Sequence, residues 1–497
     1  MRKAFFLVLL LTSCHRVIKP PPHIPPARRV IILNWPVRVR VKIFSFKNSF
    51  RFGIRGNFRV SNGTELKTGY YLMQLKNARK AKFLYYEIVE KSDQPFRKIP
   101  PGLFHIDVGA VIHLDGITID NRDFYLLRGP VREDEIDGKI YREPYIRQAG
   151  FFELQDSSGR KILEARDSIV LYPEGGHFFL DEGDSITGKI IFTINTGGDG
   201  VVVVEEDLED YIKHVLPAEM PPSFPFEALK AQAVVARTFA ISHLGKSFRY
   251  QPYDFVGSVL SQAFSPARTS VSDSAVDVTR GIVLFFEGRV AQVFYHSTCG
   301  GHTEDIGYIW ETREVPYLKG VKDGKFRFNL QDPVEVRLFL KSPPDSVLCN
   351  YVESPAIKRY VQKNFRWKVE FSRKEVEKMI SNFLHQNIGR LKAIVPLSRG
   401  VSGRITEVLI TGTRKNLTIR GEYRIRKLFG GLKSSLFYVD YERNQKGDIE
   451  RVIFVGGGSG HGVGMCQVGA GILAERGFKM KDILMHYFPG VKGVKVY

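Results

Sequence analysis

The chain has 497 residues, of which 43% are hydrophobic and 12% aromatic, so it is long enough for two or three domains and too apolar to be disordered. Its formal net charge of +20 calls for a polyanionic neighbour. Nucleic acid is not the expected neighbour, because the basic residues are scattered along the chain and the N-terminus carries a secretory signal.

The N-terminus predicts export and anchoring. Two basic residues precede the apolar run 4–11, and Leu11-Thr12-Ser13-Cys14 fits a bacterial lipoprotein cleavage box in which Cys14 becomes the lipidated first residue. The run is too short for an ordinary transmembrane helix. We therefore expect a lipoprotein-type signal peptide over residues 1–14, a Pro-rich spacer over 15–29 and an extracytoplasmic, membrane-anchored protein. The alternative is a plain cleaved signal peptide with an incidental cysteine.

Residues 30–195 have the pattern of short antiparallel strands. Val37–Ile43 and Gly188–Ile194 alternate polar and apolar residues, and Asn-Gly and Gly-rich turns separate such segments. The sequence therefore predicts a β-rich N-terminal domain.

An amphipathic helix is predicted next, from about Asp207 to Leu216, with acidic residues at its start. Pro217 is expected to end it, and further prolines follow at 221 and 222. Between them, Glu219 would be a carboxylate held rigidly in a loop, as catalysis requires. The alternative is an ordinary solvated acid.

A second helix is predicted to begin near Pro225, with an apolar stripe through Leu229, Ala233 and Ala236. Lys230 and Arg237 lie seven residues apart and would share one face. Two cations there could bind an anionic or hydroxyl-rich ligand near the acid. The alternative is that both cations simply face water.

A glycine-rich turn follows a strand predicted over Val290–Tyr295. In His296-Ser297-Thr298-Cys299-Gly300-Gly301-His302, glycines permit close ligand approach and polar side chains can bind hydroxyl groups. Two other functions are chemically conceivable for this segment. His296, Cys299 and His302 could bind zinc, but only three ligands are local and their spacing is not a standard zinc pattern. Cys299 beside a histidine could be a nucleophile, as in cell-wall peptidases.

The rest of the chain is predicted to hold a folded insertion over residues 323–449, with a helix at 373–386 and a strand at 405–411. The final part, 450–497, contains a Gly-rich turn at 456–462 and a helix starting at Gly469. After Cys14, three cysteines remain, at 299, 349 and 466, an odd number that does not describe a disulfide framework.

Four sequence blocks resemble the stage II sporulation protein D family (SpoIID/LytB type). They occur in the family's order over roughly residues 195–495. The first block combines Leu208-Glu209-Asp210-Tyr211, Pro217-Ala218-Glu219-Met220-Pro221, the run 227–234 and Ala236-Arg237-Thr238; the others are 294–304, Pro316-Tyr317-Leu318 and 460–470. The fold expected from the resemblance is α+β, with a catalytic core at 196–322 and 450–497.

The resemblance implies a lytic transglycosylase that acts on peptidoglycan glycan strands stripped of stem peptides and cleaves between N-acetylmuramic acid and N-acetylglucosamine. The family's catalytic acid falls on Glu219. Such an acid must be protonated near neutral pH, so we expect burial against Met220 and Phe224 to raise its pKa. The substrate-site residues implied beside it are Lys230, Arg237, Gln262, His296, Ser297, Gly300, Gly301, Tyr317, His461 and Gln467.

Two further expectations depend on the resemblance. Some family members carry a zinc site in a Cys-x4-His-Cys segment, but 256–262 here holds Val, Leu and Ser at the ligand positions, so we expect no metal there and no cofactor. Cys299 and Cys466 stand where serine is common, so Cys299 is expected to pack or to line the groove. The same broad family includes amidase enhancers, which leaves a second hypothesis: a non-catalytic protein that binds glycan or a cell-wall amidase.

Overall fold

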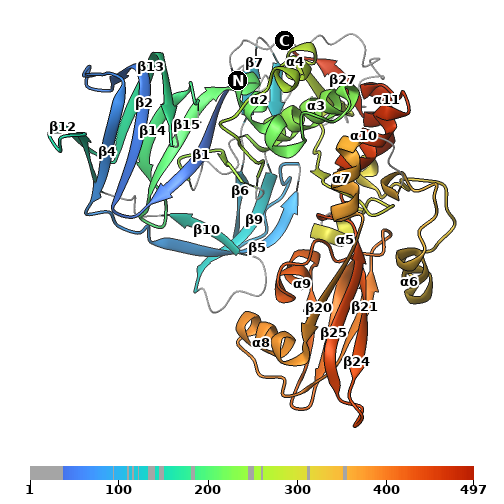
Figure 1. Ribbon diagram of the computed structural model, residues 1–497. Helices are drawn as coiled ribbons and strands as arrows, with labels where there is room; N and C mark the ends of the chain where they lie inside the picture. The colour runs from blue at the N-terminus through green and yellow to red at the C-terminus, as the bar shows by residue number, and fades with distance from the viewer. Residues whose placement is uncertain are drawn as a thin grey trace, which may run out of the picture.

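The computed structural model describes residues 37–497 apart from 93, 109–110, 115–116, 121–122, 133–139, 145–149, 181–184, 245–250, 259–260, 311–313 and 351–354. The predicted lipidation site Cys14 and the Pro-rich spacer lie outside the described residues. Within the described residues, we find no helix that combines the length and the apolar character needed to cross a membrane. The fold class is α+β, as the sequence predicted, with a β-rich N-terminal part (Figure 1).

A ten-stranded sheet dominates the N-terminal part. Its apolar face is built by alternation, as in β1, where Val39 and Val41 are fully buried while their neighbours are more exposed. The strands follow the order β12-β11-β4-β2-β13-β14-β15-β1-β16, with β3 paired to β2. Their bounds are β1 Arg38–Phe46, β2 Ser49–Val60, β3 Glu65–Leu66, β4 Gly69–Lys76, β11 Phe151–Asp156, β12 Lys161–Arg166, β13 Ser168–Phe179, β14 Lys189–Ile194, β15 Gly200–Asp207 and β16 Phe255–Val256.

A four-stranded sheet and a hairpin complete this part. The sheet has the order β10-β5-β9-β6, and β7 pairs only with β8 among the described strands. The bounds are β5 Phe83–Ser92, β6 Leu103–Val108, β7 Val111–Leu114, β8 Ile117–Asp120, β9 Asp123–Val131 and β10 Ile140–Pro144. A cavity of about 1290 Å³ lies in this part, lined by residues between Lys47 and Gln251 that include none of the predicted site residues.

The predicted domain boundary at 195 falls within the ten-stranded sheet. Strand β15 follows that residue and pairs with both β14 and β1, so the sheet extends to Asp207. The main chain then enters the helical core directly, with Asp207 as the N-cap of the next helix. The sheet is therefore joined without a linker to the helix that carries Glu219.

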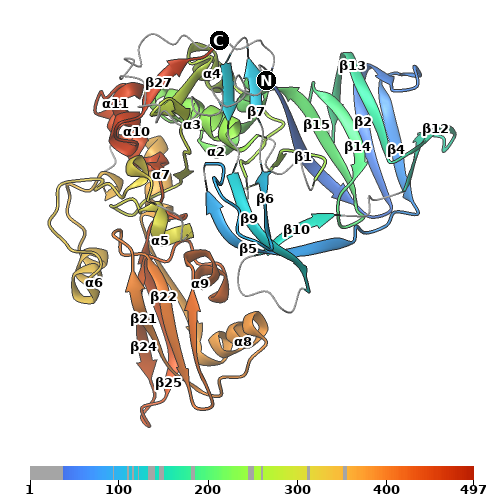
Figure 2. The same cartoon turned by 180° about the vertical axis from the view of Figure 1, so that it is seen from behind.

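The helical core packs α3 against α2, α4, α10 and α11, and Figures 1 and 2 show these helices gathered beside the large sheet. Short strands connect them: β17 pairs with β18 and β27, and β19 pairs with β26. The bounds are α2 Leu208–Glu219, α3 Phe226–His243, α4 Ser270–Val278, β17 Ile282–Phe286, β18 Arg289–Val290, β19 Tyr295–His296, α5 Ile306–Trp310, η4 Pro316–Leu318, β26 Met465–Cys466, α10 Gln467–Glu475, α11 Met480–Tyr487 and β27 Lys492–Lys495. The strand predicted over Val290–Tyr295 is wrong, because only its two ends pair.

The insertion forms a separate lobe that projects from the core (Figure 1). It contains the sheets β20-β25-β24 and β21-β22-β23, and its apolar core extends from Trp367 to Phe454. The bounds are β20 Arg366–Ser372, α8 Arg373–Leu384, β21 Leu391–Arg399, β22 Ile405–Gly412, β23 Asn416–Arg420, α9 Glu422–Leu428, β24 Phe437–Arg443 and β25 Ile449–Gly457. The predicted helix and strand of the insertion are confirmed.

The expected limits of the insertion differ from its packing. Leu330, Val336 and Phe365 belong to the apolar cluster of the helical core, although they follow residue 323. The connecting elements are α6 Pro333–Lys341, η5 Leu348–Asn350 and α7 Pro355–Asn364. At the other end, β25 crosses the expected limit at 449 and pairs with β20 and β24. The lobe therefore spans about 366–457.

Candidate active site

Glu219 is the last residue of α2 and is not in a loop. The helix begins at Leu208, after the N-cap Asp207, whose side chain accepts a hydrogen bond from the Asp210 N–H. It continues through Pro217 and ends at Glu219, before the C-cap Met220. The prediction that Pro217 ends the helix is therefore wrong. A proline costs one backbone hydrogen bond inside a helix, and the packed apolar face of α2 outweighs that loss for one more turn.

The environment of Glu219 favours its protonated form. Burial raises the pKa of the Glu219 carboxyl above its usual 4.5, while hydrogen bonds from the Ala263 N–H and the Tyr295 hydroxyl oppose that rise. The Ala263 nitrogen lies 2.6 Å from Oε1. Burial outweighs the two hydrogen bonds, so the predicted direction of the shift is confirmed.

A buried chain of hydrogen bonds fixes Tyr295. Gln262 donates from Nε2 to the Tyr295 hydroxyl at 3.2 Å and accepts at Oε1 from the Tyr211 hydroxyl at 3.1 Å. Gln262 has no exposed surface, so its prediction as a direct substrate contact is wrong. Its amide positions the tyrosine that touches the acid.

The predicted pair of cations does not face the acid. Arg237 is fully buried and binds Glu209 through two bonds of 2.7 Å, with carbonyl oxygens as further partners. It joins α3 to α2, and its prediction as a ligand contact is wrong. Lys230 pairs with Glu227 at 2.6 Å, and neither cation is among the groups that shift the pKa of Glu219. Neither cation therefore opposes the rise in the pKa of Glu219.

His296 and Ser297 follow Tyr295 directly. His296 is 4% exposed, and its Nδ1 lies 3.2 Å from the Val463 carbonyl oxygen. Ser297 keeps part of its surface exposed and its hydroxyl accepts from the Asn364 amide at 3.3 Å. Ser297 is therefore the more exposed of the two residues.

Gly300 and Gly301 have structural roles. Their φ angles are +83° and +125°, and Cβ atoms there would lie 3.0 Å from the Gly458 nitrogen and 2.5 Å from the Phe339 ring. Both glycines are buried against protein. The space that we predicted for a ligand beside these glycines is occupied by other residues of the chain. Neither glycine can therefore contact substrate directly.

Two of the weaker candidates also lie within the protein. The Tyr317 hydroxyl accepts the Gln292 N–H at 2.9 Å, and Gln467 donates to the buried Gln232 at 3.4 Å. Both side chains are less than 8% exposed, and their role as substrate contacts stays a prediction. His461 remains partly exposed, and its Nδ1 accepts the Val463 N–H at 3.0 Å. Burial lowers the pKa of His461, which keeps the ring neutral.

An aromatic surface that the sequence analysis missed lies beside these residues. The Trp310 ring is 42% exposed and lies 5.1 Å from His461 and 4.6 Å from Phe294, measured between ring centroids. Phe294 directly precedes Tyr295. Because the exposed Trp310 ring packs beside Phe294 and the partly exposed His461, close to Tyr295, Trp310 is a candidate ligand contact.

Arg404 reaches from the base of the insertion into the core. Its guanidinium is fully buried and donates to the carbonyl oxygens of Cys299 at 3.1 Å and Gly460 at 3.4 Å. It also lies beside the buried Glu304, whose pKa is raised by burial to about 7. One side chain of the insertion thus joins the turn after β19 to the turn before β26.

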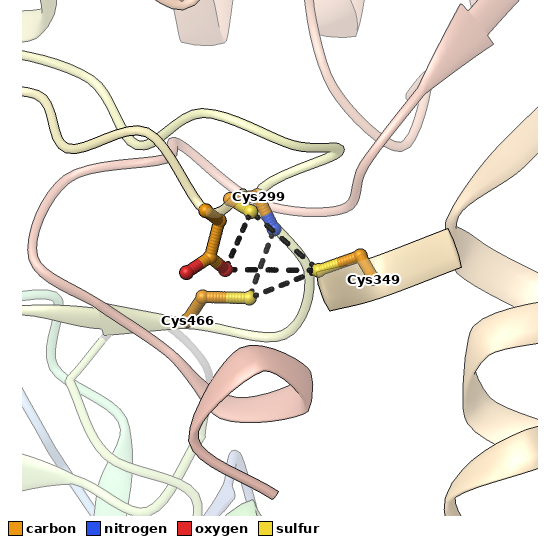
Figure 3. A group of neighbouring side chains, drawn as sticks. Cys299, Cys349 and Cys466 are labelled. Atoms are coloured by element: carbon orange, nitrogen blue, oxygen red, sulfur yellow. Dashed lines mark hydrogen bonds between the residues drawn. The ribbon is translucent and has the colours of Figure 1, made fainter. Parts of the chain in front are cut away.

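The three thiols of the core meet at one point. The Sγ atoms of Cys299 and Cys349 are 3.5 Å apart, and that of Cys466 lies 3.6 Å from Cys349 (Figure 3). The Asp323 carboxylate lies 3.1 Å from Cys299, and all four side chains are fully buried. A buried Cys299 cannot attack a peptide, which removes the basis of the peptidase hypothesis.

The local zinc triad weighed from the sequence does not assemble. His302 directs Nδ1 to the Thr303 carbonyl oxygen at 2.6 Å, and His296 directs Nδ1 to the Val463 carbonyl oxygen at 3.2 Å. Among the described residues, the set close enough to hold a metal is the three cysteines with Asp323. The segment 256–262 is only partly described, so the expectation of no metal there stays a prediction.

Known proteins match the chain in the regions that build these features. A family described as stage II sporulation protein matches residues 197–286, and a domain of unknown function matches 304–464. An uncharacterized protein of Brachyspira hyodysenteriae is 30% identical over 354 residues, 68% of this chain and 80% of that protein. The chain belongs to the stage II sporulation protein D family.

Two relatives in this family carry a functional name. The stage II sporulation protein D of Bacillus subtilis is 28% identical over 301 residues, 57% of this chain and 74% of that protein. The amidase enhancer of Bacillus subtilis is 28% identical over 386 residues, which cover 72% of this chain and about half of the enhancer (52%). Membership of the stage II sporulation protein D family supports a function related to the cell wall.

Proposed function

We propose that this protein is a peptidoglycan lytic transglycosylase in which Glu219 is the single acid and base. The observation that carries the proposal is the placement of one partly exposed glutamate whose carboxyl pKa is raised by burial. Among the described residues, the groups that act on that pKa are the Ala263 amide and the Tyr295 hydroxyl, and none of them is a carboxylate. A glycoside hydrolase of the usual kind would place a second acid near the first.

The reaction needs only the groups that surround Glu219. The protonated carboxyl donates its proton to the glycosidic oxygen while the bond from that oxygen to C1 of N-acetylmuramic acid breaks. The C6 hydroxyl of the same sugar then attacks C1, and its proton returns to the carboxylate. The product is a 1,6-anhydromuramyl end, and no water is consumed. The Ala263 N–H and the Tyr295 hydroxyl stabilise the carboxylate that exists between the two proton transfers.

The surface around the acid supports a sugar substrate. Ser297 offers a hydroxyl, and Trp310 offers an exposed ring beside the partly exposed His461. A flat ring covers the apolar face of a sugar, while the polar groups bind its hydroxyls. We infer that Trp310 binds the sugar next to the cleaved bond.

The setting proposed for this activity is the cell envelope, with the chain anchored through a lipid on Cys14. The formal charge of +20 favours association with the muramyl carboxylates of the wall or with anionic lipid headgroups. Peptidoglycan glycan strands are the proposed partner, and under the alternative below a cell-wall amidase is a second one.

The test is incubation with peptide-free glycan strands, followed by mass spectrometry of the chain ends. We expect 1,6-anhydromuramyl ends from the wild type and a loss of about 10²–10⁴-fold in Glu219→Gln, because the general acid is removed. Glu314→Gln is the matched control, since its carboxylate is 83% exposed and pairs only with Lys319 among the ion pairs of the described residues. Reducing ends would contradict the transglycosylase and indicate a hydrolase.

The alternative function is a non-catalytic amidase enhancer, supported by the relative of that name. In that case the glycan would stay intact, Glu219→Gln would match the wild type, and the protein would still bind glycan and raise the rate of an added cell-wall amidase. These outcomes separate the two functions in one set of reactions.

A further inference from the structure

The three cysteines and Asp323 form a closed set of metal-binding groups outside the Glu219 site. They come from four separate segments: the turn after β19, the loop before α6, the 3₁₀ helix η5 and strand β26. Figure 3 shows the three sulfur atoms pointing toward one another. We propose that one zinc ion binds to four side chains of this protein: Cys299, Asp323, Cys349 and Cys466.

The spacing of the ligand atoms fits a single tetrahedral ion. A Zn–S bond of about 2.3 Å in a tetrahedron places two sulfurs about 3.8 Å apart. The measured Sγ–Sγ distances are 3.5 and 3.6 Å, and the Asp323 Oδ2 atom lies 3.1 and 3.9 Å from two of the sulfurs. All four ligand atoms lie within 4.8 Å of one another. Zinc can enter this set without a large movement of the backbone.

The carboxylate is oriented toward the sulfurs by neighbours that are not ligands. The Oδ1 atom of Asp323 lies 3.0 Å from His486 Nε2 and accepts from the Tyr487 hydroxyl at 2.8 Å. The Tyr487 hydroxyl also lies 3.0 Å from Oδ2, the oxygen that lies 3.1 Å from the Cys299 sulfur. Metal sites use such neighbours to orient their carboxylate ligands. A Cβ at Gly469 would lie 2.3 Å from Oδ2, so glycine there makes room for the carboxylate.

Backbone amides and one buried cation compensate negative charge at the sulfurs. The Cys299 N–H donates to the Cys466 sulfur at 3.2 Å, and the Gly301 N–H donates to the Cys299 sulfur at 3.2 Å. Arg366 lies near Cys299 and Cys349, while its hydrogen bonds among the described residues go to carbonyl oxygens and none to a carboxylate. A buried guanidinium needs negative charge nearby, and coordinated thiolates supply it.

The chemistry and burial of the set select zinc in a structural role. Thiolates bind zinc tightly, and a site with four protein ligands and no exposed surface leaves no position for substrate. A disulfide would use two of the three thiols and leave the third beside Asp323. All three thiols are free, and a zinc ion engages every one of them. Each thiol loses its proton on binding. The ion would hold together β19, η5 and β26.

The experiment measures transition metals in the full chain purified without chelator, by inductively coupled plasma mass spectrometry. We expect one zinc per chain. Cobalt added to the metal-free protein should give the sulfur-to-cobalt charge-transfer absorption that reports thiolate ligands. A preparation with less than about a tenth of an equivalent of zinc, with another transition metal in its place, or with two of the three thiols oxidised to a disulfide would overturn the proposal.

Three variants test the site: one changes a ligand, one changes a neighbour of a ligand and one is a control. Cys349→Ser should lose zinc and the cobalt absorption. His486→Gln changes a partly exposed neighbour of Asp323 and should weaken zinc binding by about 10–100-fold while the chain still folds. His105→Gln, an exposed histidine of strand β6, is the matched control and should bind like the wild type. Equal zinc affinity in Cys349→Ser, His486→Gln and wild type would overturn the proposal even if other variants fail to fold.

Discussion

The Glu219 site and the cluster of Cys299, Cys349 and Cys466 are close in the fold and differ in their exposure to solvent. Both are joined by the pair β19–β26, in which Tyr295 pairs with Met465 and His296 with Cys466. Tyr295 touches a partly exposed acid, whereas Cys466 lies in a group with no exposed surface. This small strand pair therefore connects two different environments: Tyr295 contacts the partly exposed Glu219, and Cys466 lies within the buried group of thiols.

The largest expected effect comes from removing the ion pair that joins α3 to α2, the helix that carries Glu219, while the thiols stay unchanged. Arg237→Met removes the partner of the buried Glu209 and should destabilise the protein by about 3–5 kcal/mol, because an uncompensated charge remains between α2 and α3. Lys230→Met, on the same helix, should change stability by no more than about 0.5 kcal/mol. Urea unfolding measures both. Equal losses would show that Lys230 is also structural.

The second prediction sharpens the role of the partly exposed acid. Glu219 must start protonated, and its folded-state pKa is raised above 4.5, so activity should fall as pH rises through that raised value. The Tyr295 hydroxyl lowers this pKa. Tyr295→Phe should therefore move the alkaline loss of activity to higher pH.

The same variant should also lower the rate at the optimum by about 10- to 100-fold, because the carboxylate loses a donor worth about 1.5–3 kcal/mol. The measurement is the pH profile of kcat/KM on glycan strands. An alkaline limb that stays in place in Tyr295→Phe would contradict the proposed contact, whatever the rate. Tyr317→Phe is a suitable control, since that hydroxyl accepts a backbone N–H away from the acid.

The smallest expected effect concerns Trp310, the exposed aromatic residue of the candidate site. Trp310→Ala should weaken glycan binding by about 2- to 10-fold, the range expected for a lost aromatic contact, with little change in kcat. Tyr172→Ala is the control, an exposed aromatic side chain in the N-terminal sheet. A fall in kcat without a change in KM would instead place Trp310 in the chemical step.

The sequence predicted what depends on neighbouring residues. Local alternation and caps indicated the strands at 37–43 and 188–194 and the helices after Asp207 and Pro225, and the position of Glu219 came with them. The exception was Pro217, because a proline inside a predicted helix usually ends it. Here tertiary packing of α2 keeps the last turn helical, an influence that no local pattern contains.

The functions of single side chains were harder to predict, since a sequence does not say which face of a helix is covered. Lys230 and Arg237 share a face at helical spacing, yet only structure shows that Arg237 meets Glu209. Cys299 meets Asp323 across 24 residues, Cys349 across 50 and Cys466 across 167, so no local spacing could indicate the cluster. Tyr295 stands within a recognisable sequence block. Its contact with Glu219 depends on the tertiary position of β19, which the sequence does not give.

Arg404 has a consequence for attempts to shorten this protein. A fragment limited to the matched residues 197–286 would lack the guanidinium that holds the Cys299 and Gly460 carbonyls, and it would also lack the two loops themselves. Excision of the lobe at 366–457 would leave those carbonyls and Glu304 without their buried counterpart. We therefore expect excision of the lobe to destabilise the helical core, because one buried side chain of the lobe holds two of its turns together.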